Sequence, residues 1–339
     1  MARFIGVDLH PSCFTACVVD AKGREQFSEY KLAALDKFKE SLRRTDLLAV
    51  EATGNTRFFC EQLAGCVKRV AVVNPRQFEV IKRSSAKTDK RDAANLALFL
   101  SKGLLPEARM KDKEQAELSS LVQTRDKLVK QRTQLLNKLH AHMTAHGLRS
   151  KKEAYASERG LVRVLEEPVF TAIERVEVEV IVAQVRSLNT GIQRLDEEIK
   201  EHGPKLEGHD QLTSIKGIGS RSATILLSVI GEVEDFSDEA KLASYFGIVP
   251  VVRQSSETEH HGRITKGGSK LGRTTLVQCT LSALRYSPYL KKFYDRIKAR
   301  RGAGKAIIAT ARKFLGIIYQ TLKNKWVFAD FPNFVLAEQ

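Results

Sequence analysis

The chain has 339 residues, of which 42% are hydrophobic and 28% charged, as expected for a globular protein of about two or three domains. Its charge is unusual, because 56 Lys and Arg against 40 Asp and Glu give a formal net charge of +16. A charge of this sign indicates a polyanionic partner, most often nucleic acid, with an anionic membrane surface as the alternative. The sequence contains no apolar run near the ~20 residues of a membrane-spanning helix and no signal-peptide pattern. We therefore expect a cytoplasmic, nucleoid-associated protein.

The first 110 residues predict an α/β domain with a mixed sheet. Short β-rich runs at 3–9, 14–21 and 25–32 predict three strands joined by hairpins. Helices are expected at 35–44 and 56–64, alternating with strands at 47–53 and 68–75. Residues 77–83 also look helical, and a further helix is expected over 89–103.

Four carboxylates stand where these predicted elements end or begin. Asp8 ends the first strand in IGVDLH, and Glu51 ends another in LLAVEATG. Asp89 and Asp92 open the helix in KTDKRDA, and their spacing puts both on one helix face. A charge such as Asp8 at the centre of a sheet is costly without a metal or a partner. Together the four predict an oxygen-ligand site for Mg²⁺ or Mn²⁺ that supports phosphoryl transfer. Taken singly, Asp89 could cap the helix and Glu51 could pair with a surface Lys.

Residues 111–205 predict a helical region. Charged helical patterns run from about 112 to 146 and from about 171 to 202, separated by a less regular insertion. Leucines at helical spacing in the first pattern favour an antiparallel or intermolecular coiled coil, so we expect an oligomerisation arm. A spacer arm without that role is the alternative.

Residues 206–339 predict a basic, mainly helical domain that binds DNA. From Arg253 to Lys325 there are 17 Lys or Arg and three acids, so this stretch carries 17 − 3 = +14. Near its start, LTSIKGIGSRSATILLSVIG resembles a helix-hairpin-helix, in which Gly217 and Gly219 would permit a tight turn beside a phosphate. A plain turn between two helices is the alternative. Phe293 and Tyr294, in a basic segment, could stack on bases or simply pack.

These motifs, in this order, resemble the RuvC-like transposases of bacterial insertion sequences called DEDD transposases, in the branch of Piv-type invertases and bridge-RNA-guided recombinases. The stretches that carry the resemblance extend from residue 3 to about residue 280 and are IGVDLH, VEATG, VVNP, KTDKRDA, LTSIKGIG, ASYFGIVPVVRQSS and GRITKGGSKLGR. The resemblance implies an RNase H-like (RuvC-like) fold in which Asp8, Glu51, Asp89 and Asp92 are catalytic and bind metal. It also implies action on donor and target DNA, an element-encoded guide RNA, and a dimer or tetramer with a composite active site.

The family places a nucleophilic serine five residues after the proline of its Gly-x-x-Pro motif. Here GIVP ends at Pro250, so the fifth residue onward is Ser255, in what looks like a basic polar loop. The family often has Ser-Gly at this place, whereas this chain has Ser255-Ser256, so Ser256 is the alternative nucleophile. The resemblance implies attack by this serine on DNA and a covalent serine–DNA intermediate. The cations predicted to hold phosphates near it are Arg253, Arg263, Lys266, Lys270 and Arg273.

Histidines and cysteines offer weaker candidates. His142 and His146 stand four residues apart on a helix and could bind zinc, but solvated helix histidines fit better because no HExxH motif is present. His260 and His261 could act as a base for the serine, although phosphate contact fits better. The five cysteines form no Cys-x-x-Cys pair and predict small buried side chains.

The sequence leaves two other activities open. A RuvC-like nuclease that uses water would need the carboxylates but no serine. A degenerate element-derived protein would bind nucleic acid without cutting it.

Overall fold

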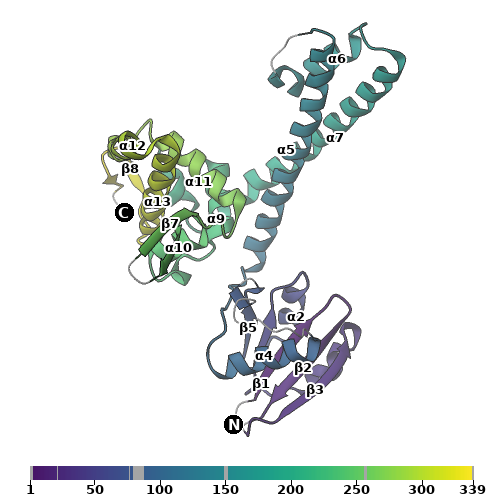
Figure 1. The fold of residues 1–339 in the computed structure, drawn as a ribbon, viewed down its shortest axis with the longest axis vertical. Helices are drawn as coiled ribbons and strands as arrows, with labels where there is room; N and C mark the ends of the chain where they lie inside the picture. The colour runs from purple at the N-terminus through teal and green to yellow at the C-terminus, as the bar shows by residue number, and fades with distance from the viewer. Residues whose placement is uncertain are drawn as a thin grey trace. The chain divides into compact units, whose positions relative to one another are not determined.

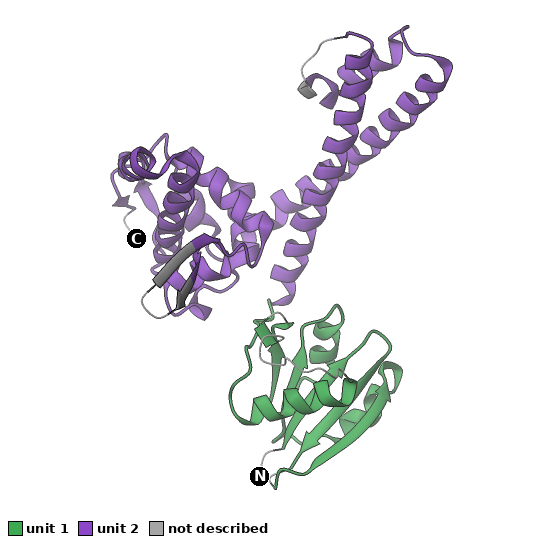
Figure 2. Cartoon of the chain, in the orientation of Figure 1, with its two compact units in different colours: residues 1–111 green, residues 112–339 purple. Residues whose placement is uncertain are grey.

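A computed structural model describes residues 3–20, 22–75, 77–78, 88–148, 152–255 and 258–337. The chain divides into two compact units, residues 1–111 and 112–339, which Figure 2 shows in green and purple. Each unit has hydrophobic clusters of its own. The division into three domains that we expect from the sequence stays a prediction.

The first unit is built on a mixed five-stranded sheet with the order β3-β2-β1-β4-β5. β1, β2 and β3 form an antiparallel meander, β4 is parallel to β1, and β5 is parallel to β4. β1 is therefore the central strand, as the sequence predicts. The strands are β1 (Phe4–Leu9), β2 (Cys13–Val19), β3 (Glu25–Lys31), β4 (Leu47–Glu51) and β5 (Arg69–Val73).

Helices cover both faces of this sheet. Alternate residues of β1, such as Ile5 and Val7, are fully buried in a cluster with α1 and α2. The intervening residues face α4, which crosses the sheet over β1 and β2 (Figure 1). The prediction of an α/β unit with a mixed sheet is confirmed. The helices whose bounds the structure describes are η1 (Leu32–Ala34), α1 (Leu35–Ser41), α2 (Thr56–Gln62) and α4 (Asp89–Ser101). The helix expected over 77–83 lies largely outside the described residues.

α4 lies unusually close to β1 because residue 6 is glycine. A Cβ atom on Gly6 would lie 2.0 Å from the backbone oxygen of Ala93 and 2.5 Å from the backbone nitrogen of Ala97. Real Cβ atoms do not approach backbone atoms this closely, so any side chain here has to push the helix off the strand. Gly6 thus sets the distance between the middle of α4 and the central strand.

The second unit begins with two long helices that pack against each other in antiparallel order. Arg125 donates two hydrogen bonds to Asp196, of 2.7 and 3.1 Å, and Arg132 donates one of 3.0 Å to Asn189. A buried cluster that includes residues of α6 joins their far ends. The predicted irregular insertion thus contains regular structure. The elements are α5 (Lys113–Ala145), η2 (Lys152–Ala156), α6 (Glu158–Glu166) and α7 (Ala172–His202).

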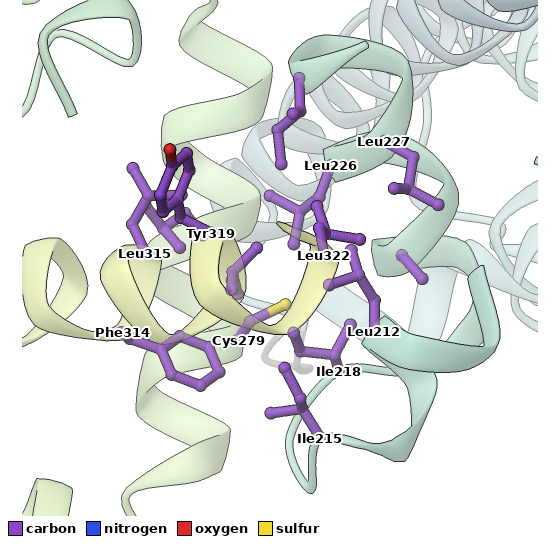
Figure 3. Close-up of a cluster of buried hydrophobic side chains, with 14 of the residues drawn as sticks. Leu212, Ile215, Ile218, Leu226, Leu227, Cys279, Phe314, Leu315, Tyr319 and Leu322 are labelled. Atoms are coloured by element: carbon purple, nitrogen blue, oxygen red, sulfur yellow. The ribbon is translucent and has the colours of Figure 1, made fainter. Parts of the chain in front are cut away.

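The rest of the second unit packs around α9 and α13. Leu226 on α9 and Phe314 and Leu315 on α13 are fully buried in the largest hydrophobic cluster (Figure 3). None of the described helices is long and apolar enough to cross a membrane. The elements are η3 (Gly203–Lys205), α8 (His209–Ser214), α9 (Ser220–Ile230), η4 (Val233–Asp235), α10 (Glu239–Tyr245), β6 (Pro250–Ser255), β7 (Thr258–Ile264), α11 (Lys270–Ala283), α12 (Pro288–Arg301), α13 (Ala303–Lys323), β8 (Phe328–Asp330) and β9 (Val335–Leu336).

Replacing Gly6 by Ala tests the contact between α4 and β1. We expect the added methyl group to destabilise the first unit by about 1–3 kcal/mol, because the helix backbone has to move. Amide hydrogens of β1 and α4 should then exchange roughly 5- to 150-fold faster. The control is Gly54→Ala, since nothing lies within 4 Å of a Cβ atom at Gly54. Equal exchange rates in the two variants would contradict this role of Gly6.

Candidate active site and nucleic-acid interface

Asp8 and Glu51 lie at matching positions on two neighbouring parallel strands. The register pairs Gly6 with Ala49 and Val7 with Val50, so the next position brings Asp8 beside Glu51 at the same end of the sheet. Residues two apart on a strand share a face, so both carboxylates lie on the α4 face, as Gly6 and Ala49 do. The Asp8 side chain is only 13% exposed.

The loop that follows β4 is held by hydrogen bonds at this same edge. The Thr56 hydroxyl donates to the Glu51 carbonyl oxygen at 2.8 Å and accepts from the Thr53 amide at 2.8 Å. The Asn55 side chain donates to the carbonyl oxygen of His10 at 3.0 Å, which ties this loop to the end of β1. The backbone around Asp8 and Glu51 is therefore fixed by local contacts.

α4 brings the other two carboxylates to the sheet. The Thr88 side chain accepts a hydrogen bond from the Arg91 amide and is the N-cap, so the alternative in which Asp89 caps the helix is wrong. Asp89 is the first residue of α4 and is 60% exposed, whereas Asp92 is buried. Both add negative charge at the positive end of the helix dipole.

The structure gathers Asp8, Asp89 and a residue that our sequence analysis does not single out, His10. One ligand atom from each of the three lies within 4.8 Å of the other two. The His10 Nε2 atom is 3.5 Å from an Asp8 oxygen and 3.4 Å from an Asp89 oxygen. Glu51 and Asp92 are not members of this group. The feature of the sequence that could have indicated His10 is its position two residues after Asp8. In an extended chain, side chains two residues apart point to the same face.

The chemistry of this group fits a divalent cation. Two carboxylates supply oxygen ligands and an imidazole supplies a nitrogen. Although the His10 side chain is 43% exposed, its Nε2 atom is buried and makes no hydrogen bond with any described residue, despite the two nearby carboxylates. A buried nitrogen without a hydrogen-bond partner is energetically unfavourable unless something else occupies the space between it and the carboxylates.

Ser255 lies in a β-hairpin and not in the polar loop that we expect from the sequence. β6 pairs antiparallel with β7, and Ser255, the last residue of β6, is in register with Thr258. β-Branched residues such as Val251 and Val252 favour this strand over a loop. Arg253 lies in β6 opposite His260, and His261 is opposite Val252. Ser256 lies outside the described residues.

The base of this hairpin is held by glycines and one arginine. Gly247 and Gly268 have φ of +66° and +68°, and a Cβ atom on either would lie within 2.2 Å of a backbone oxygen. The Arg273 Nη1 atom donates to the carbonyl oxygens of Phe246 and Gly267, at 3.2 and 2.5 Å. Burial lowers the pKa of this guanidinium. Arg273 thus stabilises the loop before α11, and its predicted contact with nucleic acid remains a prediction.

The other predicted nucleic-acid contacts differ in their surroundings. Arg263, Lys266 and Lys270 are exposed near the hairpin base. Gly217 has φ of +114°, and a Cβ atom there would lie 2.6 Å from the backbone nitrogen of Ala283, so close packing against α11 requires this glycine. Gly219 is the N-cap of α9 and has open space around it. A phosphate contact by any of these residues stays a prediction.

The weaker candidates have structural roles. The His142 side chain is only 13% exposed and lies 3.2 Å from Glu177, so the prediction that it is a solvated histidine is wrong. His146 lies 3.1 Å from Glu174, and neither histidine belongs to a metal-type cluster among the described residues. Phe293 packs beside cations of its own unit, Arg296 and Lys313.

The cysteines divide by burial. Cys17, Cys60 and Cys279 are buried as predicted, whereas Cys13 is exposed and Cys66 is partly exposed. Burial raises the pKa of Cys17 to about 12 and that of Cys60 to about 11. Both are neutral thiols at physiological pH and are poor nucleophiles.

Family models of transposases match both units. Residues 5–147 match a model described as "Transposase", that of the DEDD domain of IS110 transposases. Residues 209–295 match a model described as "Transposase IS116/IS110/IS902 family". The two matches include the carboxylate group and the serine hairpin.

Named proteins match along nearly the whole chain. The chain is 24% identical over 333 residues to "Transposase for insertion sequence element IS1111A" of Coxiella burnetii, covering 95% of this chain and 90% of that protein. It is 26% identical over 354 residues to "Pilin gene-inverting protein" of Moraxella lacunata, covering 96% and 97%. The chain belongs to the IS110/IS116 family of insertion-sequence transposases, enzymes that act on DNA.

Proposed function

We propose that this transposase moves its insertion sequence by cation-assisted strand exchange through a covalent serine–DNA intermediate. The observation that carries the proposal is the approach of Asp8 and Asp89, 89 − 8 = 81 positions apart in sequence, to within 4.8 Å at the end of the central strand. Such a group can hold a divalent cation, and Mg²⁺ or Mn²⁺ suits the carboxylate oxygens. Asp8, Glu51, Asp89 and Asp92 are the proposed ligands on an RNase H-like sheet.

The cation would polarise a scissile phosphate when bound and lower the pKa of an attacking hydroxyl. The carboxylates of Asp8 and Asp89 would hold the cation in place, and the helix cap at Thr88 fixes where α4 begins. Asp92 is buried and the Asp8 side chain is only 13% exposed, which restricts rearrangement of these proposed ligands. The site is thus suited to supply a preorganised electrostatic environment for phosphoryl transfer.

Ser255 is the proposed nucleophile. Its hydroxyl oxygen would attack the phosphorus of a DNA phosphodiester and lose its proton to solvent, while the leaving deoxyribose oxygen takes up a proton. The serine phosphodiester then conserves the energy of the broken bond, so a DNA hydroxyl from a new partner can displace the serine without an external energy source. Exposed cations near the hairpin base, Arg263, Lys266 and Lys270, would hold neighbouring phosphates.

A guide RNA that specifies donor and target is part of the proposal, and it rests on the family resemblance. The +14 charge of residues 253–325 suits either RNA or DNA, because phosphate contacts carry most of the electrostatic affinity for both. Relatives named as transposases and as a gene-inverting protein both act on DNA, which fits a recombination activity.

An exposed apolar seam on α7 supports a homo-oligomer. Ile173, Val176 and Val180 are 84%, 61% and 57% exposed, and Ala183 continues the series. Their spacing of three, four and three residues is that of the a and d positions of a coiled coil. The opposite side of α7, including Val178 and Val185, is already buried within the unit. We propose that the seam packs against another copy of the chain in a dimer or tetramer.

Removing either carboxylate of the group tests the cation site. Asp8→Asn and Asp89→Asn should each reduce metal-dependent DNA cleavage at least about 100-fold, because one anionic ligand is lost with little change in shape. Asp36→Asn is the control, since Asp36 pairs with Lys39 on the surface of the same unit. Unchanged cleavage in both active-site variants would show that the group has no catalytic role. A wild-type chain that binds but never cuts DNA would indicate a degenerate binding protein.

Replacing each serine in turn tests the nucleophile. Ser255→Ala should abolish the covalent protein–DNA adduct and strand exchange while DNA binding persists, because only the attacking oxygen is removed. Ser256→Ala should keep both and serves as the matched control. The measurement is recovery of denaturation-resistant adducts from cells that carry the element with its flanking DNA. Cleavage that persists in Ser255→Ala would instead indicate a nuclease that uses water.

Polar substitutions in the seam test the oligomer. The triple variant Ile173→Ser, Val176→Ser, Val180→Ser should weaken self-association at least about tenfold, because each residue loses apolar area that association buries. Sedimentation velocity over a range of protein concentrations measures the change. The control is Leu104→Ser, an equally exposed apolar residue of the first unit. An identical association constant for the triple variant and wild type would exclude the seam as an interface.

A further inference from the structure

We propose that His10 is a direct ligand of the active-site cation, and that its nitrogen makes the site prefer Mn²⁺ to Mg²⁺. The inference rests on the proposed function, because it assumes that a cation binds beside Asp8 and Asp89. It goes beyond that function by adding a nitrogen ligand to a site otherwise made of carboxylates.

The geometry favours coordination over hydrogen bonding. The His10 Nε2 atom lies 3.5 Å from Asp8 and 3.4 Å from Asp89, longer than the 2.7–3.2 Å usual for N–H···O hydrogen bonds. It makes no hydrogen bond with either. Two neighbouring ligands bound at about 2.1 Å to one ion lie roughly 3.0–3.5 Å apart, depending on the coordination angle. The two separations that involve His10 agree with a shared ion.

The position of His10 is fixed by the backbone on both sides. Its amide donates to the Cys13 carbonyl oxygen at 2.9 Å, and its carbonyl oxygen accepts from the Asn55 side chain at 3.0 Å. His10 directly follows β1, whose central place in the sheet is set by pairing with two strands. A ligand held in this way loses little conformational entropy when it binds an ion.

A nitrogen ligand changes which ion the site selects. Mg²⁺ is a hard cation that binds oxygen and gives up its water reluctantly, whereas imidazole suits transition metals. Mn²⁺ accepts carboxylate oxygens and also tolerates a nitrogen ligand. We therefore expect wild-type protein to bind Mn²⁺ at least about tenfold more tightly than Mg²⁺.

Electron spin echo envelope modulation of Mn²⁺ bound to the full-length protein tests the proposal. A histidine ligand couples its ¹⁴N nucleus to the Mn²⁺ electron spin, and the modulation should change when the wild-type protein is grown with ¹⁵N-labelled histidine. His10→Gln should remove the modulation and weaken Mn²⁺ binding at least about tenfold. His202→Gln, at a histidine of similar exposure in the second unit, should leave both unchanged.

Each outcome has a distinct meaning. Mn²⁺ that binds without nitrogen modulation would overturn the role of His10 and leave the carboxylate site intact. Modulation that persists in His10→Gln would assign the nitrogen to another of the eight histidines and overturn the proposal equally. Absence of Mn²⁺ binding by wild-type protein would overturn both the inference and the proposed cation site. If His10→Gln fails to fold, the isotope experiment on the wild-type chain still shows whether any histidine binds the ion, and His10→Asn then tests whether that histidine is His10.

Discussion

The approach of the α4 backbone to the central strand is the constraint on which the active site depends. Only glycine at position 6 lets the helix lie where its first turn meets the end of β1. Asp8 comes two residues after Gly6 on the strand, and Asp89 comes one turn before Ala93 on the helix. The contact that packs the unit therefore also sets the distance between its carboxylates.

The second unit has a different requirement, because a nucleophile has to be accessible to DNA and yet held in place. Two glycines in left-handed backbone conformation and the Arg273 guanidinium hold the base of the β6–β7 hairpin against the ends of α10 and α11. Ser255 lies at the other end of β6. Arginine side chains keep their proton at physiological pH. Arg273 therefore remains a charged hydrogen-bond donor, although burial lowers its pKa. Substitutions at the base of the hairpin are thus expected to change the position of Ser255 without altering the serine itself.

Much of the first unit could be predicted from the sequence because its signals are local. Alternating apolar residues, turn residues and helix periodicity predict the described strands and helices of this unit to within a few residues, and carboxylates at strand ends indicate one edge of the sheet. His10 was missed because a single histidine after a strand has no distinctive pattern until the fold brings Asp89 beside it. The sequence favours a loop around Ser255 because polar side chains outnumber apolar ones there, although the backbone pairing of a hairpin needs no apolar residue. The seam on α7 likewise depends on which side of the helix is already buried, whereas the cap at Thr88 depends on the residue at which the helical backbone begins.

The covalent joining of Ser255 to DNA is the step on which the proposed function depends, and mass spectrometry can detect it directly. Trypsin cleaves after Arg253 and Arg263, so it releases the peptide QSSETEHHGR, which contains both serines. Adducts formed by the wild-type chain would be digested with nuclease and trypsin, and the residue that carries the remaining nucleotide located by fragmentation. The account predicts the nucleotide on Ser255. A nucleotide on Ser256 or on any other residue, or broken DNA with an unmodified peptide, would contradict it.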